Sequence, residues 1–407
     1  MTLIFFLIIL LLCFPTFVTV MVVPCYMTTQ NKREAIFYSA VLAIFYAVVG
    51  YCFKDPKTDP DIVRYIQMLQ LYRGKSLVES FNLVYDNLFS VDIWFYILSR
   101  FKDNQLLPAT SLFVFYFISF YVLSDYRIRK GISNTRFVSY AIFTILAINL
   151  GCVLNAFRSN IAFIVFFLAI YRELIQNKKN IVTYLLYVFS FFMHFAVLAL
   201  ITLRMILLIK NKKLLVGSSI LIVFMPKILE IIGNITVNLS TGNAALDQVI
   251  YFINRANMYF RWSEGGWADK VQNSGYYKVE RAYYLAIVLF IVYVSYISYK
   301  KAKRKFMIEI SMLERYQIFG IMYLAMTLIT FLITAPEYNR FVTPFLPFAS
   351  VILFDSWSDG DDILPSWIHI FLIMMGGCGI VTNCYFLNSF ISIPNYIIDI
   401  LTFSPLL

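Results

Sequence analysis

Apolar runs recur along this chain from Thr2 to Phe390, and many are long enough to cross the hydrocarbon core of a bilayer as helices. Hydrophobic residues make up 60% of the chain, whereas soluble domains are about 45–50% apolar. So many runs leave little room for a separate soluble domain. The sequence therefore predicts an all-α, polytopic transmembrane bundle, with residues 1–407 forming a single integral membrane domain.

We expect about twelve spans, with boundaries good to about three residues. Between them, residues 54–105 are expected to form an external loop with an amphipathic or re-entrant helix over Phe81–Phe101, because charges interrupt that stretch. Residues 233–280 are expected to form a second large external loop. The spans are predicted at roughly 2–23, 35–53, 106–123, 137–154, 157–171, 181–193, 195–209, 214–232, 282–299, 317–335, 341–354 and 366–386.

Lysine and arginine gather in the short connections between these runs, and the formal net charge is +11. Basic residues in short loops mark the cytoplasmic side, so both termini are predicted to lie outside. In a membrane protein such charge indicates contact with anionic lipid before nucleic acid. The expected surroundings are thus a lipid bilayer, without a nucleic-acid partner.

Two ionisable residues lie where the stretch Asn155–Phe195 would return to the external side. Arg158 opens one apolar run and His194 ends the next, so a helical hairpin places both at one membrane surface. Ionisable residues at membrane depth are costly and mark candidate sites. The alternative is that Arg158 extends to lipid headgroups while His194 caps a helix.

Further polar residues collect on the predicted external side. Arginine is the preferred two-point partner of phosphate. Several arginines that are distant in sequence but gather at one place on the external side would suit a diphosphate. The alternative is that each arginine pairs with a nearby carboxylate, as Arg340 could with Glu337. The candidate binding residues are Asp61, Arg64, Tyr65, Asn160, Arg255, Arg261, Tyr338 and Arg340.

Asp59-Pro60-Asp61 has the DxD pattern that holds a divalent metal in many sugar transferases, since such metals need clustered oxygen ligands. The central proline equally fits a turn. Walker A, HExxH, GxSxG and GxGxxG patterns do not occur in the sequence. We therefore expect no metal and no cofactor.

Three short motifs stand out: the external "TD…Y" (Thr58, Asp59, Tyr65), "FRSNIAF" (Phe157–Phe163) and "SFFMHF" (Ser190–Phe195). Together they resemble the motifs of the EpsG/Wzy-type family of bacterial polysaccharide polymerases. Arg158 and His194 match the arginine and histidine of the family pattern, while Ser159-Asn160 replaces its usual glutamine. The resemblance covers roughly residues 35–210 well and the rest loosely.

The resemblance implies a multi-pass glycosyltransferase of the bacterial cytoplasmic membrane. It would join oligosaccharide units carried on undecaprenyl diphosphate into O-antigen, capsule or exopolysaccharide on the external face, alongside a flippase and a chain-length regulator. Arg158, His194 and Asp59 would be its catalytic residues. Two alternatives are a flippase for the same lipid-linked sugars and a metal-dependent transferase of GT-C type using Asp59 and Asp61. Sequence patterns leave the sugars and their linkage open.

Overall fold

The structure is a computed structural model, and it describes most of the chain. Asp59, Arg255 and Arg261 lie outside the described residues, as do most of the expected loop over 233–280 and most of the first expected span. The described residues are 15–54, 56, 60–85, 88–209, 214–215, 217–218, 224–236, 239, 242, 246–247, 250, 254, 275–302, 312–333, 338–357 and 367–403.

Within these residues the protein is all-helical, as predicted. Four helices contain a segment long and apolar enough to cross a membrane, which indicates a membrane protein. These segments are Lys32–Tyr51, Leu106–Lys130, Lys278–Ile297 and Trp367–Asn388. They belong to α3 (Lys32–Tyr51), α7 (Leu106–Lys130), α17 (Gly275–Ala302) and α20 (Trp367–Asn388).

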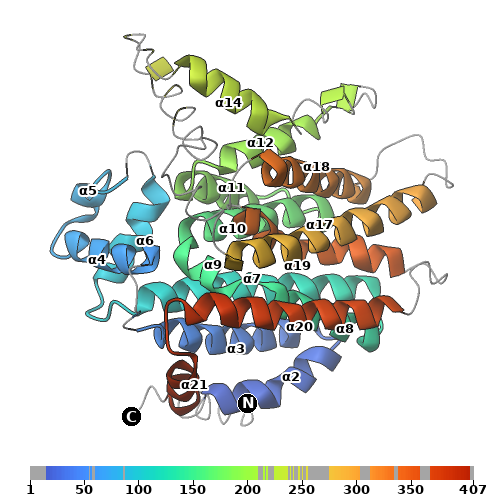
Figure 1. Cartoon of the computed structure of the whole chain (residues 1–407), viewed down its shortest axis with the longest axis horizontal. Helices are drawn as coiled ribbons and strands as arrows, with labels where there is room; N and C mark the ends of the chain where they lie inside the picture. The colour runs from blue at the N-terminus through green and yellow to red at the C-terminus, as the bar shows by residue number, and fades with distance from the viewer. Residues whose placement is uncertain are drawn as a thin grey trace.

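Helices α3 and α7 pack side by side and run antiparallel (Figure 1). The end of α3 meets the start of α7 so closely that a Cβ on Gly50 would lie 2.5 Å from the carbonyl oxygen of Pro108. At the other end, the buried Arg127 donates from Nη1 to the carbonyl of Tyr26 in α2 (Pro15–Thr28), at 3.3 Å. These contacts define two ends of the bundle, one near Pro108 and one near Arg127.

The span expected over 137–154 is broken into α8 (Asn134–Ala147) and α9 (Leu150–Asn155). A break in a buried helix frees backbone groups that need partners. Asn383 of α20 supplies them: its Nδ2 donates to the carbonyls of Leu146 and Ile148 at 3.2 and 3.0 Å, and its Oδ1 accepts from Leu150 at 2.8 Å. The kink is therefore a property of two helices together, and one span's sequence could not reveal it.

The remaining helices largely follow the expected runs, although several are too short to count as candidate spans. One more helix, α21, lies after residue 386, where the last predicted span ends. The helices are α10 (Phe157–Ile170), the short π-helix η1 (Tyr171–Ile175), α11 (Ile181–Met193), α12 (Val197–Ile206), α14 (Met225–Thr236), α18 (Met312–Ile333), α19 (Tyr338–Trp357) and α21 (Ile393–Thr402).

Residues 60–85 and 88–100 form a lobe of three helices at one end of the bundle (Figure 1). The lobe comprises α4 (Asp61–Tyr72), α5 (Leu77–Ser80) and α6 (Phe89–Ser99), where the sequence predicted one amphipathic helix over Phe81–Phe101. Aromatic contacts join the lobe to the bundle: Phe89 meets Phe192 of α11 and Trp94 meets Phe189, with ring centroids 5.3 and 6.3 Å apart.

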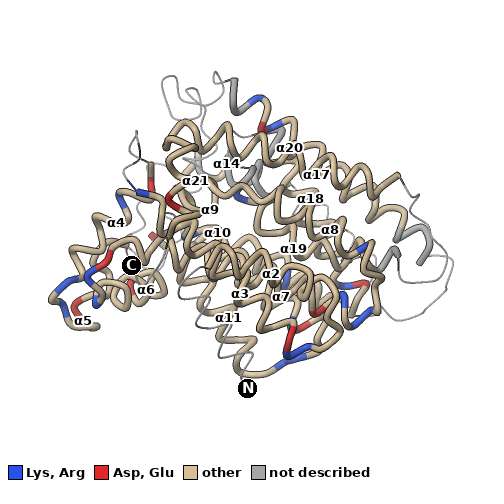
Figure 2. Tube along the Cα trace, turned by 90° about the horizontal axis from the view of Figure 1, so that it is seen from below, with Lys and Arg blue, Asp and Glu red and all other residues tan. Residues whose placement is uncertain are grey.

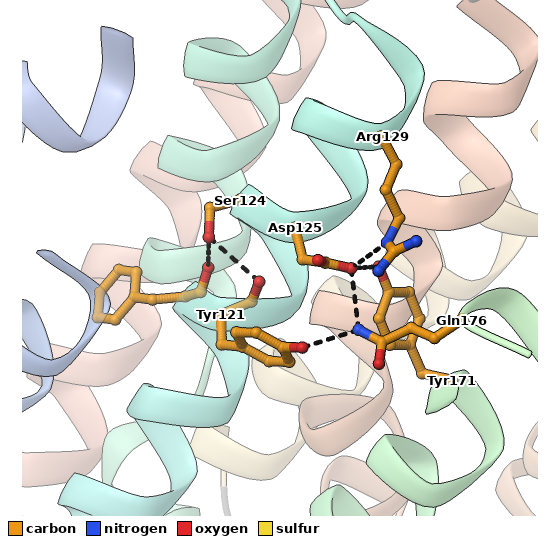
Figure 3. A network of polar contacts seen from close by, with 7 residues as sticks. Tyr121, Ser124, Asp125, Arg129, Tyr171 and Gln176 are labelled. Atoms are coloured by element: carbon orange, nitrogen blue, oxygen red, sulfur yellow. Dashed lines mark hydrogen bonds and ion pairs between the residues drawn. The ribbon is translucent and has the colours of Figure 1, made fainter. Parts of the chain in front are cut away.

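A buried hydrogen-bond network around Asp125 lies at the end of the bundle near Arg127 (Figure 3). One carboxylate oxygen of Asp125 accepts from the Tyr171 hydroxyl at 2.6 Å, Gln176 Nε2 at 3.0 Å and Arg129 Nε at 2.5 Å. These bonds fasten η1 to α7. They also place the basic turn that follows η1 at the same end as the basic end of α7.

Charged residues gather at the ends of the molecule. Figure 2 shows one group on the α4–α5 lobe and another beyond the ends of α7 and α8, with mostly uncharged helices between them. This pattern fits a body whose middle lies in hydrocarbon, because ionised groups are costly there.

Candidate anion-binding site

The site is built on a corner between α9 and α10, at the end of the bundle nearest the lobe. Ala156 interrupts the helix, and Asn160 stabilises the corner by donating from Nδ2 to the carbonyls of Cys152 and Ala156 at 3.0 and 3.1 Å. Helix α10 then restarts at Phe157 with no side-chain cap. Arg158 thus lies in the first turn of a helix, where free N–H groups and the helix dipole favour an anion.

The guanidinium of Arg158 lies close to two tyrosine rings of the lobe. Its central carbon is 3.9 Å from the ring centroid of Tyr85 and 5.3 Å from that of Tyr65. Nη2 also donates to the Tyr65 hydroxyl at 3.3 Å, whereas Nε is buried without a hydrogen-bond partner among the described residues. No carboxylate in the described part of the chain forms an ion pair with Arg158. Among the described residues, the partners of this cation are thus aromatic rings and one hydroxyl, and its buried Nε–H has no acceptor.

A buried carboxylate shapes the loop that carries Tyr85. Asp92 is fully buried and accepts from the Tyr72 hydroxyl at 2.6 Å and from the backbone N–H of Asn82 at 2.9 Å. Burial raises the pKa of Asp92, partly opposed by these two hydrogen bonds. Because Asn82 has a positive φ of 59°, a costly backbone conformation outside glycine, the Asp92 bond helps to retain this turn.

His194 and Arg340 reach the same region from two other helices. His194 follows the last residue of α11, and Arg340 lies in the first turn of α19. Phe163 of α10 links them: its ring centroid is 6.3 Å from that of His194 and 5.5 Å from that of Phe341. Burial, with the positive charges of Arg158 and Arg340, lowers the pKa of His194 well below its usual range.

The structure therefore brings together three residues that are far apart in sequence: Arg158, His194 and Arg340. Both arginines occupy the first turns of their helices, so helix dipoles add to their charge. Two guanidinium groups close enough to influence the charge of one imidazole form an environment that attracts an oxyanion with more than one negative charge.

The other predicted site residues have different environments. Asp61 and Arg64 pair with each other at 3.1 Å on the exposed side of α4, an arrangement that contributes little stability. Asn160 is fully buried, and its amide nitrogen is occupied by the α9–α10 corner. Tyr338 begins α19, but its side chain lies outside the described residues.

Sequence reasoning missed Tyr85, which contacts Arg158, and a buried glutamate that contacts the start of α9. Tyr85 is one of 29 tyrosines, and no pattern distinguished it. Glu280 is fully buried at the start of α17 and accepts a hydrogen bond from Asn149, the residue that caps α9. A turn further along α17, the Tyr284 hydroxyl donates to the carbonyl of Ala147 at 2.9 Å. The position of Glu280, just before the apolar run expected over 282–299, is the sequence feature that could have indicated its buried contact with Asn149.

Comparison with protein-family models, curated proteins and solved structures found no match to this chain.

Proposed function

We propose that this protein is a membrane glycosyltransferase that joins oligosaccharide units carried on a lipid diphosphate, of the undecaprenyl type, into a polysaccharide. The observation that carries the proposal is the convergence of Arg158, Arg340 and His194 at one end of an apolar helical bundle. A diphosphate is a multiply charged anion on a lipid tail, so it would need cations at the membrane surface and apolar helices beneath them. The sequence resemblance to the EpsG/Wzy-type polymerases supports the same reading.

The proposed topology follows from the basic connections. Arg129 and Lys130 end α7, and Lys178 and Lys179 follow η1, at the end of the bundle opposite Arg158. The positive-inside rule assigns that end to the cytoplasm. In the proposed arrangement about twelve spans cross the bacterial cytoplasmic membrane, with both termini, the lobe and the anion site outside.

The proposed chemistry requires little beyond charge stabilisation at the leaving group. Transfer of the growing glycan breaks the bond between its anomeric carbon and the diphosphate oxygen, and negative charge develops on that oxygen. Arg158 and Arg340 would bind the diphosphate and stabilise this charge. A carboxylate would accept the proton of the attacking sugar hydroxyl; Asp59 is the candidate from the sequence.

The test exchanges Arg158 for lysine and alanine in cells that make the polysaccharide. Lysine keeps the charge but loses the planar two-point fork, and alanine loses both. A charged hydrogen bond contributes about 1.5–3 kcal/mol, so alanine should reduce polymerisation by roughly tenfold to a hundredfold, with lysine between. Arg73→Ala is the matched control, because Arg73 is an exposed arginine of the same lobe that binds Lys102 and Asn104 instead.

The carrier-linked products separate the alternatives. A polymerase defect leaves single units on their carrier at the external face, whereas a flippase defect leaves them at the cytoplasmic face. Wild-type chain lengths from a normally expressed Arg158→Ala protein would refute the assignment of Arg158.

A further inference from the structure

His194 has one ring nitrogen already occupied as an acceptor. The backbone N–H of Ala196 donates to His194 Nδ1, with the two nitrogens 3.2 Å apart. A nitrogen that accepts a hydrogen bond carries the lone pair, and a neutral imidazole has a single N–H. The proton of neutral His194 is therefore on Nε2, which makes Nε2 a donor.

The surroundings of the ring keep it neutral and oriented. The Phe195 ring stacks on it at 5.0 Å with an interplanar angle of 17°, and the Phe163 ring meets it edge-on. Both neighbours are phenylalanine rings, which provide no oxygen or nitrogen acceptor for a second ring proton. Burial, together with the positive charges of Arg158 and Arg340, holds the pKa of His194 well below its usual range.

We propose that His194 is a hydrogen-bond donor, whose Nε2–H binds the same oxyanion as Arg158 and Arg340, and that it is not the general base. This inference rests on the proposed function, because it names how the same site holds the diphosphate. A base needs a free lone pair facing the reacting hydroxyl, and the only lone pair of this tautomer is engaged by Ala196. A neutral donor can stabilise developing negative charge without itself changing protonation state.

Two amide substitutions distinguish donor from base. His194→Gln places an amide N–H near the former Nε2 position but cannot accept a proton. His194→Asn places an amide oxygen near the former Nδ1 position, where it can accept from Ala196, and offers no donor at Nε2. Asparagine therefore preserves the local turn while removing the proposed interaction, and His194→Ala removes both.

The experiment measures binding of farnesyl diphosphate and inorganic pyrophosphate to the purified full chain in detergent micelles. The glutamine variant should bind within about threefold of wild type, while the asparagine and alanine variants should bind roughly tenfold or more weakly. Chain polymerisation in cells should follow the same order. Arg158→Ala provides the reference for loss of the anion site, and elution as a single sharp species confirms that each variant is folded.

The outcomes separate this inference from the proposed function. If the glutamine variant binds and polymerises as poorly as alanine while Arg158→Ala is also defective, the donor role is wrong and the lipid-diphosphate function stands. If the asparagine variant matches wild type, the donor role is again wrong. If wild type binds neither diphosphate, both the inference and the proposed function are overturned.

Discussion

Removing the ring of Tyr85 tests whether the two tyrosines hold Arg158 ready for an anion. The guanidinium carbon lies 3.9 Å from the Tyr85 ring centroid, the closer of its two ring contacts. Such cation–π contacts contribute about 0.5–1 kcal/mol at exposed sites and about 2 kcal/mol when desolvated. Arg158 is half-buried, so we expect Tyr85→Leu to remove about 1–2 kcal/mol of the interaction free energy that holds the Arg158 side chain in place.

That cost should appear as weaker binding of the ligand. An arginine side chain released from its ring contacts regains rotamer freedom, which ligand binding must then remove. The expected loss of affinity for farnesyl diphosphate is about fivefold to thirtyfold. Tyr85→Phe should stay close to wild type, because it keeps the ring that contacts Arg158, while the hydroxyl that it removes makes a weak contact with the Met68 sulfur at 3.6 Å.

The matched control is Tyr96→Leu. Tyr96 makes a similar cation–π contact in the same lobe, with the Arg100 guanidinium 4.5 Å from its ring centroid, whereas the described ring contacts of Arg158 are with Tyr65 and Tyr85. Affinity should therefore change little. Titration of each purified variant with farnesyl diphosphate provides the measurement. Wild-type affinity in Tyr85→Leu, or an equal loss in Tyr85→Phe, would refute the argument that the ring positions Arg158.

Three further predictions concern topology, packing and metal. With the exposed native cysteines replaced, a cysteine at Lys75 should react with an impermeant external thiol reagent in intact cells, and one at Lys130 should not; the opposite labelling would move the site to the cytoplasm. Gly379→Ala should destabilise the protein by about 1–3 kcal/mol, because its Cβ would lie 2.3 Å from the carbonyl oxygen of Leu146. Gly377→Ala is the control, with nothing within 4 Å of its Cβ, and equal melting temperatures for the two variants would contradict the predicted clash. Polymerising activity should survive EDTA, since arginines would face the diphosphate; loss restored by Mg²⁺ or Mn²⁺ would favour the metal-dependent transferase.

The helical class and much of the element order could be read from the sequence. Apolar runs of helical length leave few other structures in a bilayer, because every backbone polar group there must be satisfied internally. The run predicted over 181–193 is α11, which begins at Ile181 and ends at Met193. Such boundaries are local: polar residues and caps on either side of a run set them, as Asn180 does by accepting from Thr183.

The breaks and the site's supporting residues depended on tertiary contacts. The α8–α9 kink needs Asn383 from α20, more than 200 residues away. The sequence indicated Arg158 and His194, because ionisable groups beside apolar runs are unusual. It did not indicate that Tyr85 would stack on Arg158, or that Ala196 would occupy His194 Nδ1. These properties depend on which side chains meet across helices and on how the chain turns, whereas hydropathy records only how each residue partitions between water and lipid.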